Sequence, residues 1–224
     1  MTPKEVVVSK FNESVPTLLQ RDILRSVLAC YQQADKHVKR HYPPTEAATL
    51  RGWVRRADIE VDLRNVAAKY VGAEANPEPN SSRSMFHSVL VVGAVKLTQS
   101  KLAHPSQMVR PSAFREEYAQ ESAQLLLGFV KKRARKVVPI GEQEYLFGVL
   151  THGCSRKDKS RPYFVRFSFP NKDCTDWIGH VDLILKFPDV VNEFYAPIVN
   201  TEAQQQQRVR LKKGIKRGGK EKRA

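Results

Sequence analysis

Two hydrophobic periods follow one another along this chain, and they limit its possible folds more than any other feature. Over residues 17–40 apolar side chains recur every three or four positions, at Leu19, Ile23, Val27, Tyr31, Ala34 and Val38. This spacing predicts an amphipathic helix. In the last third, Tyr145, Phe147 and Val149, and after a loop Tyr163, Val165, Phe167 and Phe169, occupy alternate positions, which predicts a β-hairpin. The sequence therefore indicates an α+β fold.

Further elements fill in this outline. We expect helices over residues 45–57 and 59–71, with Thr45 as the N-cap and a break at Asp58, and another that Pro111 and Ser112 open and that ends in the basic run 131–136. The β-branched runs at Val6–Lys10 and at residues 85–97 predict strands, and Trp177–Phe187 predicts a third strand beside the hairpin. The expected fold has a helical N-terminal half, a C-terminal antiparallel hairpin plus a third strand packed on helices, and a disordered basic tail.

A polar, proline-containing segment after Gly72 marks a boundary in the chain. We expect a mainly helical region over 1–72, a linker or long loop over 73–84, an α+β region over 85–200 and a disordered basic tail over 201–224. Three glycines in the tail, at Gly214, Gly218 and Gly219, oppose a stable helix there.

Positive charge is the strongest functional signal in the sequence. The formal net charge is +15 and the isoelectric point is about 9.9, which predicts salt-sensitive attraction to polyanions. Residues 208–224 alone hold nine basic side chains and one acidic one. The predicted nucleic-acid-binding residues are Lys131, Lys132, Arg133, Arg135, Lys136, Arg156, Lys157, Lys159, Arg161, Arg208, Arg210, Lys212, Lys213, Lys216, Arg217, Lys220, Lys222 and Arg223.

These clusters predict a non-enzymatic protein that binds RNA or DNA, largely independently of base sequence, in a structural, packaging or accessory role. Self-association is a further expectation, and the spaced basic clusters of the tail fit recognition by the nuclear import machinery. An alternative is a matrix-like viral structural protein that binds an anionic membrane surface and self-assembles.

Enzymatic and metal-binding interpretations are weaker. His152, Cys154, Cys174 and His180 lack the spacing of zinc ligands. A metal-dependent nuclease would need converging carboxylates, which Asp176 and Asp182 near Lys186, with Glu142 and Glu144, could supply. The run Gly214–Lys220 imitates a phosphate-binding loop, but Glu221 replaces the required hydroxyl residue. We predict no cofactor, no metal and no catalytic residue, and keep the nuclease as an alternative.

Three cysteines without a CxxC pair, and the absence of a signal-like or membrane-spanning apolar run, predict an intracellular, soluble protein. In a eukaryotic setting the basic tail would direct the protein to the nucleus.

Overall fold

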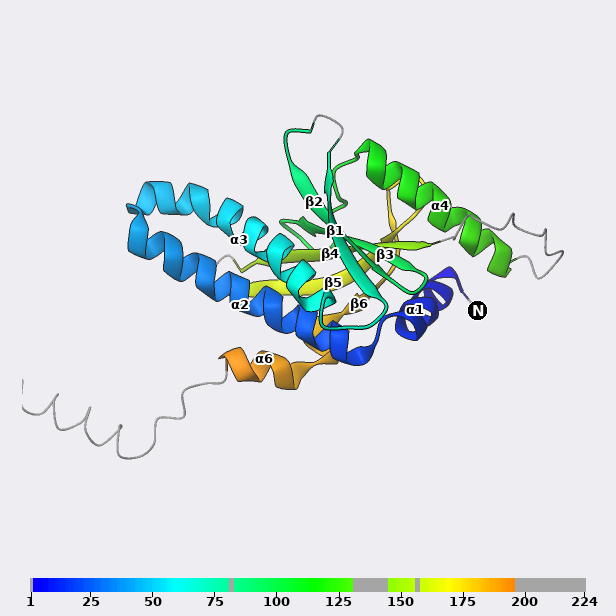
Figure 1. Ribbon diagram of the computed structural model, residues 1–224, viewed down its shortest axis with the longest axis horizontal. Coiled ribbons are helices and arrows are strands. Elements are labelled where there is room, and N and C mark those ends of the chain that lie inside the picture. The colour runs from blue at the N-terminus through cyan, green and yellow to red at the C-terminus, as the bar shows by residue number, and fades with distance from the viewer. Residues whose placement is uncertain (1, 81–82, 131–144, 156–157, 196–224) are drawn as a thin grey trace, which may run out of the picture. The chain divides into compact units, whose positions relative to one another are not determined.

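A mixed sheet with helices on both faces forms the centre of the molecule (Figure 1). The computed structural model describes residues 2–80, 83–130, 145–155 and 158–195, and within these ranges it contains six helices and six strands. This confirms the predicted α+β class. Residues Met1–Phe194 form one compact unit.

The strands lie in the sheet in the order in which they occur along the chain. They are β1 (Ala73–Pro79), β2 (Phe86–Val92), β3 (Val95–Lys101), β4 (Leu146–Cys154), β5 (Pro162–Pro170) and β6 (Trp177–Asp182). All neighbours are antiparallel except β3 and β4, which are parallel. The connection between these two contains helix α4 (Ala113–Val130), as a parallel pair requires a crossover.

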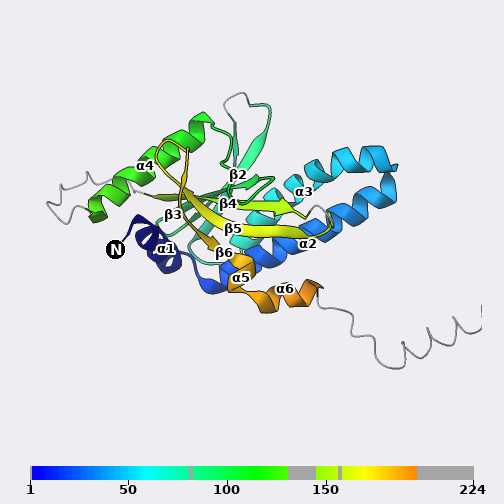
Figure 2. The ribbon, with the colours of Figure 1, turned by 180° about the vertical axis from the view of Figure 1, so that it is seen from behind.

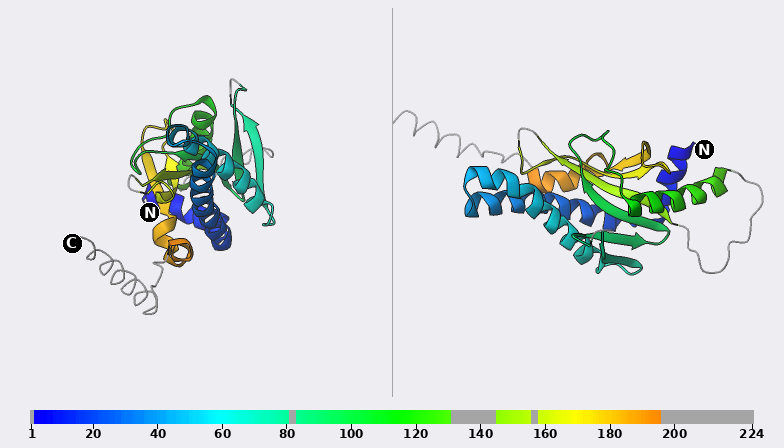
Figure 3. Two further views of the ribbon diagram at one scale, coloured as in Figure 1. Left: turned by 90° about the vertical axis from the view of Figure 1, so that its left-hand side faces the viewer. Right: turned by 90° about the horizontal axis from the view of Figure 1, so that it is seen from above.

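Three helices cover one face of this sheet. They are α1 (Pro3–Ser14), α2 (Thr17–His41) and α3 (Pro44–Ala67). Helices α2 and α3 lie side by side as a long hairpin whose turn projects beyond the strands (Figures 1 and 3). Phe11 of α1 packs on two rings of β5, with centroid separations of 4.8 Å to Phe167 and 5.5 Å to Phe169.

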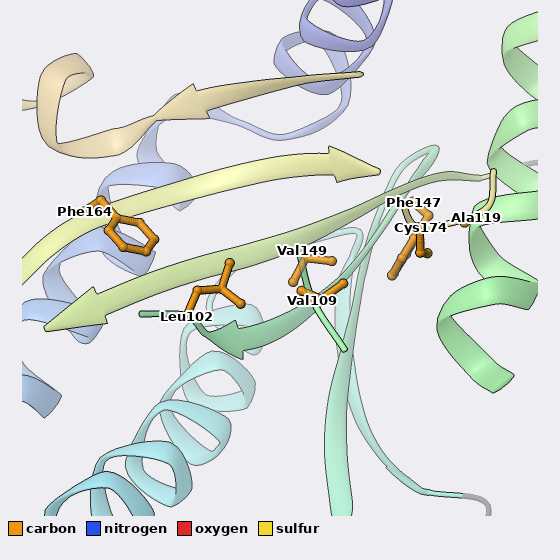
Figure 4. Close-up of a cluster of buried hydrophobic side chains, with 7 residues drawn as sticks. All are labelled: Leu102, Val109, Ala119, Phe147, Val149, Phe164 and Cys174. Atoms are coloured by element: carbon orange, nitrogen blue, oxygen red, sulfur yellow. The ribbon is translucent and has the colours of Figure 1, made fainter. Parts of the chain in front are cut away.

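The opposite face is covered by α4 and by the segment that follows β3. Its apolar cluster consists of Leu102, Val109, Ala119, Phe147, Val149, Phe164 and Cys174 (Figure 4). The side chains of Tyr118 and Trp177 pack against this cluster. Both faces of the central strands are therefore covered, which explains why β4 is buried at every position from Leu146 to Gly153 instead of at alternate positions.

The strand predicted at Val6–Lys10 is wrong, because this segment lies within α1. Thr2 and Glu5 form a reciprocal capping box at its N-terminus, and Pro3 occupies the first turn. Val7 and Phe11, four residues apart, are buried on the sheet side of the helix. Capping and tertiary packing together outweigh the strand preference of three consecutive valines.

Two predictions about residues 43–84 are also wrong. Helix α3 runs through Asp58 without a break, and its N-cap is Pro43 instead of Thr45. The expected linker or long loop at 73–84 contains strand β1, which pairs with β2 from Ala73 to Pro79. Its two prolines are tolerated because β1 lies at the edge of the sheet.

The remaining elements follow the sequence more closely. The helix over 17–40, the helix after Ser112 and the hairpin of β4 and β5 are confirmed. The strand expected over Trp177–Phe187 ends at Asp182, whose carboxylate accepts a hydrogen bond from the backbone N–H of Leu185 and caps α5 (Leu183–Lys186). Helix α6 (Pro188–Tyr195) follows α5 beside α2 (Figure 2).

Candidate nucleic-acid interface

Only two of the predicted nucleic-acid-binding residues lie in the part of the chain that the structure describes. Lys159 and Arg161 are exposed in the loop between β4 and β5. The other sixteen lie outside the described residues: Lys131, Lys132, Arg133, Arg135, Lys136, Arg156, Lys157, Arg208, Arg210, Lys212, Lys213, Lys216, Arg217, Lys220, Lys222 and Arg223. Glu142 and Glu144, which the nuclease interpretation used, lie outside them as well.

The β4–β5 loop is closed by its own backbone. The N–H of Ser155 donates to the carbonyl of Arg161 at 3.0 Å, and the N–H of Arg161 donates to the carbonyl of Asp158 at 3.3 Å. The carboxylate of Asp158 accepts hydrogen bonds from the hydroxyl and the N–H of Ser160. These bonds, more than the nearby charge of Arg161, hold the pKa of Asp158 below its usual value.

The turn of the α2–α3 hairpin brings further cations to this loop. Lys39, whose side chain is 66% exposed, and Arg51 share the buried carboxylate of Asp35, with N–O distances of 2.6 Å and 2.8 Å. The Arg51 contact is an ion pair, not an aligned hydrogen bond. Lys39 also lies close enough to Asp158 for its charge to lower the pKa of that carboxyl group. The helical hairpin and the strand loop therefore meet at one end of the sheet.

Arg55 of α3 is the least expected member of this group, because its side chain is only 1% exposed. Its guanidinium lies over the ring of Tyr31 at 3.8 Å and donates to the backbone carbonyl of Lys159 at 2.8 Å. Its Nε has no hydrogen-bond partner, and no carboxylate of the described residues forms an ion pair with it. Arg55 thus fastens the β4–β5 loop to α3 and adds an uncompensated positive charge beneath it.

Lys101 completes the group at the end of β3. It pairs with His152 across the parallel ladder and is exposed. Its Nζ lies 3.6 Å from the position that a Cβ on Gly52 would occupy, so the lysine reaches the surface of α3. We call Lys39, Arg51, Arg55, Lys101, Lys159 and Arg161 the basic end. Asp35 pairs with Lys39 and Arg51, and Asp158 pairs with Arg161.

A line of buried polar groups runs from the basic end across the sheet. His152 contacts the hydroxyl of Tyr31 through Nδ1 at 2.9 Å and the amide oxygen of Gln99 through Nε2 at 3.0 Å. The Gln99 amide donates to Glu60 at 2.7 Å, and the other oxygen of Glu60 accepts from the backbone N–H of Ser88. Because the Gln99 amide nitrogen donates to Glu60, its oxygen faces His152 and accepts from Nε2–H. In the neutral imidazole with this tautomer, Nδ1 then accepts from the Tyr31 hydroxyl.

Burial acts on His152 in the same direction. Desolvation, followed by the charges of Arg55 and Lys101, lowers the pKa of His152 to about 3. The neutral imidazole is therefore the form that the folded protein holds at neutral pH. Arg55 and Lys101 of the basic end therefore add to the effect of desolvation in keeping this histidine neutral.

The residues considered for a metal or a nuclease site are not brought together. Asp182 accepts a hydrogen bond from Nε of Arg166 at 2.8 Å, and Lys186 donates to Asn12 and Gln20. Cys154 and Cys174 carry free thiols. Over the described ranges, no group of three or more histidine, cysteine, aspartate or glutamate side chains could hold a metal ion.

Sequence reasoning missed four members of the basic end for one reason. Lys39, Arg51, Arg55 and Lys101 could not be connected with the loop at Lys159 from their places in the sequence. Their common position depends on the order of the strands and on the length of the α2–α3 hairpin. The sequence signal that could have marked them is the recurrence of Arg51 and Arg55 at a four-residue spacing, which places both on one side of a helix.

Comparison with protein-family models, with curated proteins and with solved structures gives no match for this chain. Among the described helices, none is long and apolar enough to cross a membrane.

Proposed function

We propose that this protein binds nucleic acid without acting as an enzyme, and that the basic end is the contact surface of its folded part. The observation that supports this most directly is the convergence of six cations from α2, α3, β3 and the β4–β5 loop, three of which pair with Asp35 or Asp158. Phosphate groups are the natural partners of such a surface, since their neutralisation releases condensed counterions.

The arrangement of the basic end suits contact with the nucleic-acid backbone better than recognition of the bases. Arg161 and Lys159 project from a closed loop, and Lys39 projects from the last turn of α2. The two loop side chains do not extend from a helix, as the base-reading side chains of a recognition helix do. The proposed binding is therefore largely independent of base sequence, with residues 208–224 supplying further cations.

The proposal is tested by salt-titrated binding of RNA, duplex DNA and anionic liposomes to the full chain and to residues 1–203. We expect both forms to bind nucleic acid with an affinity that falls steeply with salt, and the shorter form to bind more weakly. Tighter binding to liposomes would instead support the matrix-like alternative. Salt-independent binding, or no binding to nucleic acid, contradicts the proposal.

Charge-reversal variants distinguish binding at the basic end from general attraction of nucleic acid to the net positive charge of the protein. We expect Lys159→Glu with Arg161→Glu to weaken binding at least tenfold at physiological salt. Lys4→Glu with Lys172→Glu is the matched control, because it changes the net charge by the same amount and both lysines are exposed. Lys172 lies just beyond the opposite end of β5, roughly 30 Å from Arg161 at 3.3 Å per residue, and Lys4 lies beside Gly179, which pairs with Phe169 near that end. Equal losses in the two proteins would mean that only net charge matters.

A second candidate function is metal-assisted cleavage of phosphodiesters, the nuclease alternative at a different place. Glu60, Gln99 and Lys101 provide a carboxylate, an amide oxygen and a lysine, the last two on one face of β3. Hard divalent cations prefer such oxygens. The group has one carboxylate, whose oxygens already accept hydrogen bonds, so this candidate ranks second. Cleavage that requires Mg²⁺ or Mn²⁺ and is lost in Glu60→Gln would establish it; no cleavage with either metal would exclude it.

A further inference from the structure

Few aromatic side chains of the described residues are exposed to solvent. Among the described residues, only Tyr42, Trp53, Phe86 and Tyr163 are exposed aromatics. Tyr163 is the most exposed of the four, at 65%, and it lies two residues after Arg161 of the basic end. An exposed ring beside clustered cations is the arrangement with which proteins bind the bases and the backbone of a single strand together.

The local backbone explains why this ring is exposed. The register between β4 and β5 shifts at Gly153 and Cys154, so that Gly153 pairs with Phe164 and Cys154 with Pro162. Tyr163 is the extra residue of this bulge. Phe164 enters the apolar cluster, where its ring lies against the backbone of Gly153, while Tyr163 is left outside. Bulges commonly redirect a side chain in this way.

The ring of Tyr163 is also held in place without being covered. Its contact with Phe164 is edge-to-face, with centroids 6.2 Å apart and planes at 86°. This contact with a buried partner restrains the ring, and the exposure of Tyr163 leaves most of its surface for another π-system. A restrained ring costs less conformational entropy on binding than a freely rotating one.

We infer that the basic end binds single-stranded nucleic acid in preference to duplex, and that Tyr163 stacks on an unpaired base while neighbouring cations hold the phosphates. This inference rests on the proposed function and adds the class of ligand. In a duplex the faces of the bases are covered by their stacked neighbours, so a lone tyrosine gains nothing from it. A single strand offers both base faces and backbone.

The test compares three probes of equal length: a single-stranded oligonucleotide, its duplex, and a single strand that keeps the sugar-phosphate backbone but lacks bases. Binding to full-length wild-type protein is measured beside Tyr163→Leu, which removes the ring, and Tyr163→Phe, which keeps it. We expect wild type and Tyr163→Phe to prefer the base-containing single strand. Tyr163→Leu should lose about fivefold or more of its affinity for that probe and none for the abasic strand.

Each outcome separates this inference from the proposed function. If duplex, abasic and base-containing strands bind equally, or if Tyr163→Leu binds all three as wild type does, the single-strand inference is wrong while nucleic-acid binding stands. If no probe binds, the proposed function itself fails. Thermal unfolding of Tyr163→Leu and Tyr163→Phe identifies any loss of fold, and an unfolded Tyr163→Leu leaves the comparison of the three probes on wild-type protein to decide.

Discussion

Arg55 shows at the scale of one residue how this fold combines stability with charge. A buried guanidinium is costly unless its hydrogen bonds and charge are satisfied. Here the compensation is partial, since the group has the face of Tyr31, one carbonyl at Lys159 and an Nε without a partner. Such an arrangement favours a role in positioning the β4–β5 loop over a role in stabilising the core.

Replacing Arg55 with methionine tests this distinction. An apolar side chain of similar length should leave the free energy of unfolding within about 1 kcal/mol of wild type, because it removes a burial cost along with the contacts. The loop should lose its anchor. Hydrogen exchange measured by mass spectrometry should then show faster exchange of the Ser155 and Arg161 amides, which close the loop. Unchanged exchange with a large loss of stability would show that Arg55 is mainly structural.

His152 makes stability depend on pH. Its pKa is lowered to about 3 by burial first and by Arg55 and Lys101 next, whereas in the unfolded chain it is about 6.5. Between these values the unfolded chain binds more protons, so stability rises with pH across this window and is lost as pH falls below about 6.5. The loss is at most about 1.4 kcal/mol per pH unit. Desolvation also lowers the pKa of His87, which adds to the same trend.

Urea unfolding at pH 7 and at pH 5 measures this dependence. In His152→Gln the difference between the two pH values should shrink, although the contribution of His87 remains. A difference equal to that of wild type would place the pH dependence elsewhere.

At the scale of the elements, the sequence predicts the helices and strands that local chemistry determines. It misses those that depend on packing against neighbouring elements. The regular spacing from Leu19 to Val38 fixes α2 within one residue of its observed end. Strand β1 has no apolar alternation and contains two prolines, so its pairing depends on the edge that β2 offers. In α1, the capping box of Thr2 and Glu5 is present in the sequence, but the strand prediction followed the run of three valines alone.

The candidate site was less predictable than the fold. The loop cations Lys159 and Arg161 are visible as a cluster in the sequence, whereas Arg55 and Lys101 join them only through the packing of α3 on the sheet. A buried arginine also has no signature that distinguishes it from an exposed one in a helical pattern. Contacts between segments that are distant in the sequence therefore could not be predicted.

Two glycine-to-alanine substitutions test the packing of these elements, and we expect them to change the stability of the protein in opposite directions. A Cβ on Gly153 of β4 would lie 2.5 Å from the carbonyl oxygen of Leu102 and 2.5 Å from Cε1 of Phe164, so Gly153→Ala should destabilise the protein by about 2 kcal/mol or more. On Gly52 of α3 the nearest atom is the flexible Nζ of Lys101 at 3.6 Å. Gly52→Ala should therefore stabilise α3 by about 0.5 to 1 kcal/mol. Chemical denaturation of both variants measures these shifts, and a stable Gly153→Ala protein would contradict the described packing of β4.

At the scale of the whole molecule, charge is divided between the folded part and the C-terminal segment. Residues 208–224 contribute nine of the 38 basic side chains, and the basic end contributes six more from distant parts of the fold. If both sets contact one nucleic acid, each phosphate contact adds to the salt dependence of binding, by about 0.7 per contact for a single strand.

The slope of log affinity against log salt therefore counts the contacts in each part. Lys159→Gln with Arg161→Gln should reduce the magnitude of the slope by about 1.4 for a single strand, because two contacts are lost. The reduction should be the same in the full chain and in residues 1–203, since separate contacts contribute additively. Lys172→Gln, at the far end of β5, should leave the slope unchanged. A reduction seen only in the full chain would mean that the basic end does not bind by itself, and that the C-terminal segment is needed to bring the nucleic acid to it.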